Sequence, residues 1–188
     1  MKTYIYFVRH GEVNNPNGVC YQRLPGFDLT EKGRKQIEKT AGYLSGKEIE
    51  AIYASPLLRT RQSAGIIKNV LKLPAVYFSK DILEVKTSLQ GKPLSYVNSL
   101  YNVFPSKTNL IKGETIEDIA KRMERFVLKI IKIHKGKNIV AVSHGDPIMI
   151  TKALLKKLPL TIESIRPGKD KYIKLGGIYT AGLTTNSL

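Results

Sequence analysis

The sequence lacks the features that would anchor it in a membrane or cross-link it covalently. Cys20 is the single cysteine among 188 residues, so no intrachain disulfide can form. No apolar run approaches the roughly 20 residues that a membrane-spanning helix requires. No repeat, low-complexity tract or linker divides the chain. We therefore expect one domain over residues 1–188, no membrane association and a cytoplasmic location.

Acidic residues are also scarce, with 15 Asp and Glu against 31 Lys and Arg, which gives a formal net charge of +16. A basic surface favours anionic partners, either a small anion or a nucleic acid. The lysines are scattered, and no basic block interleaves with aromatic residues as a nucleic-acid groove would require. The sequence therefore favours a small anionic substrate over nucleic acid. It leaves the oligomeric state open, a homodimer included.

Two apolar stretches each run into a histidine followed by a glycine. Residues 4–8 lead into Arg9 and His10, and residues 138–142 lead through a serine into His144. Short runs of β-branched and aromatic residues are typical of buried parallel strands. The carboxyl ends of such strands form the ligand-binding edge of an open α/β sheet. We therefore predict that both histidines lie at one edge of a sheet.

Helical and extended segments alternate along the chain. The alternation predicts an α/β fold, a three-layer sandwich with a mainly parallel central sheet. Thr115 opens a predicted capping box, and Ser55 and Asp146, each followed by proline, are predicted helix N-caps. Besides the two strands above, the pattern predicts helices over residues 31–45, 56–71, 94–101, 116–134 and from 147, strands over 50–54 and 74–78, and one or two edge strands within 172–183.

Two irregular segments are expected to shape the site. Residues 12–28 are rich in Asn, Pro and Gly and form a connection longer than usual, and such loops are often functional. This loop offers Asn15, Asn17 and Arg23 as hydrogen-bond donors to an anion. Residues 79–110 are the least regular part of the chain, and we expect them to be an insertion that covers the active site.

Arg59 completes a set of side chains suited to phosphate chemistry. It lies on the first turn of the helix that follows strand 50–54, which brings it to the same edge as Arg9. Two arginines can hold a phosphate by charge-assisted hydrogen bonds, and an imidazole beside them can attack phosphorus. With His144 they neutralise the charge on the phosphoryl oxygens, so neither a metal nor another cofactor is expected. The leaving alkoxide needs a proton, which calls for a carboxylic acid nearby.

Three separated motifs carry a resemblance to a known family. They are residues 7–12 (Phe-Val-Arg-His-Gly-Glu), 55–64 (Ser-Pro-Leu-Leu-Arg-Thr-Arg-Gln-Ser-Ala) and 142–145 (Val-Ser-His-Gly). In this order they resemble the histidine phosphatase superfamily, the phosphoglycerate mutase-like proteins. The resemblance spans nearly the whole chain and implies the fold of that family.

The resemblance also implies roles for individual residues. His10 corresponds to the phosphorylated nucleophile, and Arg9, Arg59 and His144 correspond to the phosphate pocket. The proton donor of the family falls on Glu84. Asp81 is the alternative donor.

The loop after the first motif departs from the family pattern. Val13 stands where the family often has a hydroxyl residue, and Pro16 replaces a usual asparagine. Asn15 and Asn17 flank that proline, and the sequence leaves open which of them contacts phosphate.

Together these features predict a metal-independent phosphomonoesterase that hydrolyses a small phosphorylated metabolite through a phosphohistidine on His10. The short chain and the loop 18–26 are similar to the small phosphatases, such as the α-ribazole phosphatase-like proteins. The alternatives are a 2,3-bisphosphoglycerate-dependent phosphoglycerate mutase and a non-catalytic phosphate or nucleic-acid binding module. The two arginines and His144 should also lower the pKa of His10, leaving its attacking nitrogen neutral at pH 7.

Overall fold

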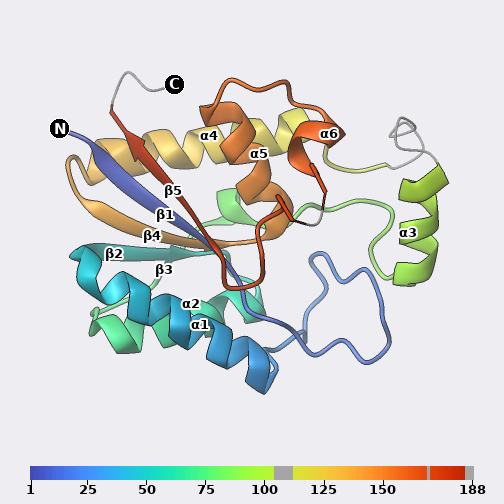
Figure 1. The fold of residues 1–188 in the computed structure, drawn as a ribbon, viewed down its shortest axis with the longest axis horizontal. Coiled ribbons are helices and arrows are strands. Elements are labelled where there is room, and N and C mark those ends of the chain that lie inside the picture. The colour runs from blue at the N-terminus through green and yellow to red at the C-terminus, as the bar shows by residue number, and fades with distance from the viewer. Residues whose placement is uncertain (104–111, 169, 185–188) are drawn as a thin grey trace.

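The computed structural model describes residues 1–103, 112–168 and 170–184. At its centre is a five-stranded sheet in the order β3-β2-β4-β1-β5 (Figure 1). Neighbouring strands are parallel except for the edge pair of β1 and β5, which is antiparallel. The strands are β1 (Thr3–Arg9), β2 (Ile49–Ala54), β3 (Tyr77–Phe78), β4 (Asn138–Ser143) and β5 (Ile178–Leu183). The predicted mainly parallel sheet is confirmed.

Helices cover both faces of this sheet (Figure 1). Helices α1 and α2 pack on one face, and α4 and α5 pack on the other. The helices are α1 (Glu31–Leu44), α2 (Leu58–Leu71), α3 (Leu94–Val103), α4 (Ile116–Ile133), α5 (Gly145–Leu155) and α6 (Ile162–Ile165), with 3-10 turns η1 (Ser45–Lys47) and η2 (Lys80–Ile82). The three-layer sandwich is therefore confirmed, and no helix of the described residues is both long and apolar enough to cross a bilayer.

Successive residues of β1 enter opposite cores. Ile5 and Phe7 are buried among α4 and α5, whereas Tyr6 and Val8 are buried beneath α1 and α2. Because both faces are covered, neither side of the strand is polar, which accounts for the continuous apolar run in the sequence.

Of the three predicted helix caps at Thr115, Ser55 and Asp146, one is present in the structure. The Thr115 capping box is confirmed. The prediction that Ser55 and Asp146 are N-caps is wrong, since α2 begins at Leu58 and α5 at Gly145, neither with a side-chain cap. The Ser55 hydroxyl instead bonds His144, and the Asp146 carboxylate binds other side chains at the sheet edge.

The two strands at the edges of the sheet, β3 and β5, differ in length from the strands predicted there. The predicted strand 74–78 is reduced to Tyr77 and Phe78, and both side chains are exposed. Pro74 cannot donate to a ladder, and only β2 is available as a neighbour, so pairing is short. At the other edge, residues 178–183 form one strand, and residues 172–177 form a loop that lies against the end of β1.

Candidate active site

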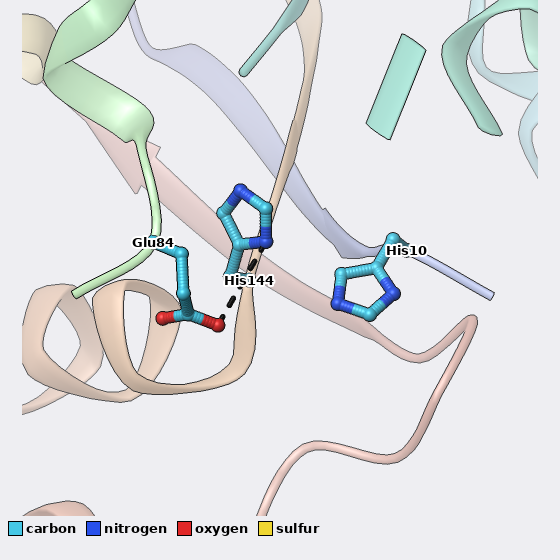
Figure 2. A group of neighbouring side chains, drawn as sticks. All are labelled: His10, Glu84 and His144. Carbon is cyan, nitrogen blue, oxygen red and sulfur yellow. Dashed lines mark ion pairs between the residues drawn. The ribbon is translucent and has the colours of Figure 1, made fainter. Parts of the chain in front are cut away.

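The ends of β1 and β4 bring His10 and His144 side by side at one edge of the sheet. The strands pair in parallel with Arg9 opposite Ser143, so the two histidines leave the sheet at the same level. Both side chains are buried, and their ring centroids lie 5.3 Å apart in an edge-on arrangement. Figure 2 shows His144 between His10 and Glu84. The predicted meeting of the two strand ends therefore holds in the structure.

Arg59, on the first turn of α2, contacts both imidazoles. Its Nε donates to His10 Nε2 at 3.3 Å, and a terminal nitrogen lies 3.1 Å from His144 Nδ1. The same terminal nitrogen donates to the Gln22 carbonyl at 2.6 Å, and the Tyr21 ring covers the guanidinium at 4.8 Å. Only 1% of Arg59 is exposed. A buried cation whose hydrogen-bond partners are neutral favours the binding of an anion beside it.

The hydrogen-bond partners fix the tautomers of the two histidines. His10 Nδ1 lies 2.8 Å from the Gly11 carbonyl, which can only accept, so Nδ1 carries the proton and Nε2 keeps its lone pair. His144 Nδ1 accepts from Arg59, which leaves Nε2 to donate to the Ser55 hydroxyl at 2.8 Å. His10 Nε2 is thus a neutral nucleophile directed at the guanidinium, where a bound anion would lie.

Burial and charge keep both imidazoles neutral. Burial is the largest cause that lowers the pKa of His10 and of His144 well below the ordinary value, and the Arg59 charge lowers both further. The prediction of a lowered pKa for His10 is confirmed, although burial contributes more than the arginines on which that prediction rested.

Glu84 supplies a carboxyl group beside the histidines. It follows η2, and its Oε2 lies 3.8 Å from His144 Nδ1 while Oε1 accepts from the Val85 amide at 2.9 Å. Burial raises the pKa of Glu84, and the nearby Asp146 charge raises it further. Asp81, the alternative proton donor, instead binds Arg125 at 2.7 Å. The structure therefore brings Glu84, and not Asp81, to the imidazoles.

Asp146 organises a cluster that the sequence pattern does not predict. Its carboxylate accepts from the Tyr172 hydroxyl at 2.7 Å and binds Arg166 through both oxygens at 3.1 and 2.5 Å. Burial raises the pKa of Asp146, but the Arg166 pairing outweighs it, and the pKa ends below its ordinary value. The Tyr172 hydroxyl also packs so closely over Gly145 that a Cβ there would clash.

Arg9 faces the same cluster. A terminal nitrogen donates to the Ile173 carbonyl at 2.7 Å, and the guanidinium lies 5.2 Å from the centre of the Tyr172 ring. Its Nε is the buried side-chain nitrogen that lacks a hydrogen-bond partner among the described residues. Because buried polar groups are nearly always paired, this donor points to a ligand.

The loop residues named from the sequence have other partners. Asn15 closes the loop on itself through two hydrogen bonds with Val19, of 3.0 and 3.1 Å. Asn17 is exposed. The Arg23 guanidinium binds the Glu84 carbonyl at 2.6 Å and the Glu114 carboxylate at 2.5 Å. Within the described residues, no hydrogen bond joins these three side chains to the imidazoles, although Arg23 holds the backbone of Glu84.

The loop 12–28 and the segment 79–103 are joined to each other by hydrogen bonds. Gln22 donates to the Thr87 hydroxyl at 2.7 Å and accepts from the Thr87 amide at 2.9 Å. A further bridge joins Val19 to Pro93. The rest of the predicted insertion 79–110 lies outside the described residues.

The imidazoles and Glu84 also suggest a metal site, but their surroundings fit one poorly. One ligand atom each from His10, Glu84 and His144 lies within 4.8 Å of the others, a donor set that transition metals accept. Arg59, however, places a fixed positive charge within hydrogen-bond distance of both imidazoles. That charge repels a divalent cation and attracts an anion.

The chain matches a known protein family over most of its length. The family model described as the histidine phosphatase superfamily (branch 1) matches residues 5–167. Phosphoserine phosphatase 1 of Hydrogenobacter thermophilus is 31% identical over 153 residues, which cover 77% of this chain and 72% of that protein.

Solved structures share the fold. A mycobacterial glucosyl-3-phosphoglycerate phosphatase superposes with a TM-score of 0.80 at 20% identity, covering 96% of this chain and 90% of that one. A putative α-ribazole-5'-phosphate phosphatase of Escherichia coli gives a TM-score of 0.75 at 21% identity, covering 95% and 89%.

Proposed function

Because this chain belongs to the histidine phosphatase superfamily, we propose that it is a metal-independent phosphomonoesterase. It hydrolyses a small phosphorylated metabolite through a phosphohistidine on His10. The observation that carries the proposal is the buried contact of Arg59 with both imidazoles, with the Glu84 carboxyl beside them. A relative named as a phosphoserine phosphatase supports the same reaction class.

In the first step, His10 Nε2 attacks the phosphorus of the substrate. The hydrogen bond from Nδ1 to the Gly11 carbonyl orients the ring and stabilises the positive charge that the imidazole gains. The new N–P bond forms as the ester P–O bond breaks, and the leaving alkoxide takes the proton of Glu84. Arg59 and the unpartnered Nε of Arg9 bind the phosphoryl oxygens. His144 accepts from Arg59 and so orients the guanidinium toward them.

In the second step, water attacks the phosphohistidine. Glu84, now a carboxylate, accepts the proton of that water, so that one residue acts first as acid and then as base. The N–P bond breaks, inorganic phosphate leaves, and His10 returns to its neutral form. The cycle leaves the protein unchanged and consumes one water.

The environment of Glu84 suits both halves of this cycle. Burial and the Asp146 charge raise its pKa, which favours the protonated carboxyl that the first step needs. Asp146 stays ionised because Arg166 and Tyr172 hold it. Two carboxyl groups at one site are thus separated into one acid and one anion.

Hydrolysis of p-nitrophenyl phosphate in EDTA tests the proposal. His10→Ala should lower kcat/KM by at least about 10⁴-fold, since the nucleophile is lost. The matched control is His134→Ala, which removes the remaining histidine of the chain. His134 lies before the amino end of β4, at the end of the strand away from His144, and its loss should leave activity unchanged. An acid-labile phosphorylated protein should be trapped with labelled substrate. Activity that persists in His10→Ala would exclude the phosphohistidine.

The alternative reaction is the mutase. Incubation with 3-phosphoglycerate and a trace of 2,3-bisphosphoglycerate, followed by assay for 2-phosphoglycerate, separates the two. We expect inorganic phosphate or no reaction, and accumulation of 2-phosphoglycerate would favour the mutase.

A further inference from the structure

Glu84, the proposed proton donor, lies on a stretch of chain without regular secondary structure. It follows η2, and residues 83–86 belong to neither a helix nor a strand. The backbone there lacks the repeating hydrogen bonds that fix a helix or a sheet. A proton donor has to stay within hydrogen-bond reach of the leaving oxygen, and a misplacement of about 1 Å can cost roughly 100-fold in rate. Contacts from other segments therefore decide where Glu84 lies.

Two arginines from distant segments reach the Glu84 carbonyl. Arg23, in the loop 12–28, donates its Nε at 2.6 Å, and a terminal nitrogen of Arg122, on α4, lies 3.5 Å away. The other terminal nitrogen of Arg122 donates to the Asp81 carbonyl at 2.7 Å. The planar fork of one guanidinium thus spans the turn that leads into Glu84. Because the carbonyl belongs to the same residue as the acid, these bonds fix the point from which the Glu84 side chain extends.

Glu114 joins the two arginines. Its Oε1 accepts from Arg122 Nε at 3.1 Å, and its Oε2 accepts from a terminal nitrogen of Arg23 at 2.5 Å. Oε2 also accepts from the Lys86 amide at 3.0 Å, and the Glu114 amide donates to the Lys86 carbonyl at 2.9 Å. One carboxylate thus binds both guanidiniums that reach Glu84 and the backbone two residues after it.

The Glu114 carboxylate also compensates charge where water is largely excluded. Arg122 is buried, and Arg23 and Glu114 are partly buried. Burial lowers the pKa of Arg122, the Glu114 charge acts against that lowering, and the Arg23 charge adds to it. The two guanidiniums therefore repel each other, and the carboxylate between them offsets the repulsion. Without it, each arginine loses a charge-assisted hydrogen bond and the force that holds it at the Glu84 carbonyl.

We propose that Glu114 is a positioning residue for the proton donor, which holds the backbone of Glu84 through Arg23 and Arg122. Glu114 takes no part in the bond changes, and the proton still passes from the Glu84 carboxyl to the leaving alkoxide. The inference rests on the proposed phosphatase function, because it assigns Glu84 the role of acid in that reaction.

The leaving group separates a displaced proton donor from a general loss of active protein. Glu114→Gln keeps the size of the side chain but removes its charge. In this variant, kcat for glycerol 3-phosphate should fall by about 10- to 100-fold. The kcat for p-nitrophenyl phosphate, whose leaving group needs little protonation, should fall by less than about threefold. Equal losses for the two esters would mean that Glu114 only supports the fold, and would contradict the inference.

A double variant tests whether Glu114 acts through Glu84. In Glu84→Gln protein no proton donor is left to position, so adding Glu114→Gln should lower kcat for glycerol 3-phosphate by less than about twofold. A further loss as large as in the wild-type background would show that Glu114 acts independently of Glu84, and the inference would be wrong. Glu117→Gln is the control, since it makes the same substitution at an exposed residue on the first turn of α4 and should leave both rates unchanged.

Hydrogen exchange separates this inference from the proposed reaction, because it needs no turnover. The Val85 amide donates to the Glu84 carboxyl at 2.9 Å, so its exchange rate reports how firmly that carboxyl is held. This amide should exchange faster in Glu114→Gln than in the wild type or in Glu117→Gln. Equal exchange in all three proteins would overturn the inference even if both esters are hydrolysed. Faster exchange in Glu114→Gln, with no ester hydrolysed by the wild type, would support the hold of Glu114 on Glu84 and reject only the phosphatase.

Discussion

Strand β4 joins two pairs of histidine and glutamate, one at each of its ends. Before the strand, His134 Nδ1 lies 2.6 Å from Glu50 Oε1, and after it His144 Nδ1 lies 3.8 Å from Glu84 Oε2. In each pair the second ring nitrogen is also held, by the Tyr53 hydroxyl at 2.9 Å in one case and by a serine hydroxyl at 2.8 Å in the other. Both imidazoles are thus fixed by the same kinds of partner.

The two pairs differ in solvent and in neighbouring charge. The Glu50 side chain is 38% exposed, and its hydrogen bond with His134 is the largest cause that lowers its pKa, followed by contacts with Lys137. Glu84 is 14% exposed, and burial raises its pKa. The same residue types therefore give a carboxyl group of lowered pKa at the more exposed end and a carboxyl group of raised pKa beside a neutral imidazole in the interior.

The parallel sheet produces this asymmetry. The carboxyl end of β4 meets the end of β1, the first turn of α2 and the loop 12–28, which together exclude water and supply Arg59. The amino end of β4 follows a helix terminus at the surface, where His134 is the C-cap of α4. The pair at the carboxyl end of β4 thus differs from the other pair because β1, α2 and the loop 12–28 bury it and place Arg59 beside it.

The largest expected effect comes from Arg59, which only the buried pair has as a neighbour. Arg59→Lys keeps the charge but loses the planar fork that contacts both imidazoles. We expect kcat/KM for p-nitrophenyl phosphate to fall by about 10³-fold. Lys137→Met, which removes the cation 3.2 Å from Glu50, should leave kcat/KM unchanged.

Thermal unfolding of both variants checks that the fold survives. Arg59 is buried and also holds the Gln22 carbonyl, so some loss of stability is expected. If Arg59→Lys is folded and retains wild-type activity, a point charge is sufficient at the site and the bidentate grip proposed here is wrong.

The second effect separates the two glutamates. Glu84→Gln cannot donate a proton, so kcat for an alkyl phosphate should fall by about 10²- to 10³-fold, with a smaller loss for p-nitrophenyl phosphate, whose leaving group needs little protonation. Glu50→Gln should leave both rates unchanged, because Glu50 contacts His134 and Lys137 and lies at the other end of β4 from the nucleophile.

The pH profile gives a second readout of Glu84. Since the protonated carboxyl is the active form, wild-type kcat/KM for the alkyl ester should decline as pH rises through the raised pKa of Glu84. That decline should be absent in Glu84→Gln. A wild-type profile that stays flat to pH 9 would contradict the role of Glu84 as acid.

Much of this site could be predicted because its geometry follows from regular elements. The carboxyl ends of parallel strands lie at one edge, so two strands that end in histidine predicted a meeting of His10 with His144. Arg59 on a first helical turn follows from the same rule. Burial of both rings could not be read from the pattern, and it is the largest cause of their lowered pKa values.

Local rules failed where a distant residue competed for the same side chain. Asp146 has the sequence context of an N-cap, yet it binds Arg166 and Tyr172, which lie 20 and 26 residues further along the chain. Arg23, named from the sequence as a donor to an anion, donates in the structure to the Glu84 carbonyl. No periodicity or motif links these positions, and only the fold of the loop before β5 brings Arg166 and Tyr172 to Asp146.

The smallest expected effect is on the free energy of unfolding. The pH range in which this free energy changes should differ between the titratable groups at the two ends of β4. His10 and His144 have folded-state pKa values well below 6.5, so as pH falls below that value the unfolded chain binds protons that the folded chain does not. The free energy of unfolding should therefore fall by about 1.4 kcal/mol per pH unit for each of these histidines. Glu50 has a lowered pKa, and its contribution is lost only as pH falls below its unfolded value of 4.5.

Urea unfolding between pH 7 and 5 measures this difference. Glu84 has a raised pKa and contributes with the opposite sign near the acid end of this range, so the comparison is made in the Glu84→Gln protein. Adding His144→Gln should flatten the loss of stability with falling pH by about 1.4 kcal/mol per unit, whereas adding Glu50→Gln should leave the slope unchanged. Parallel curves for all three proteins would show that His144 takes up a proton in the folded state, and that burial beside Arg59 does not keep it neutral.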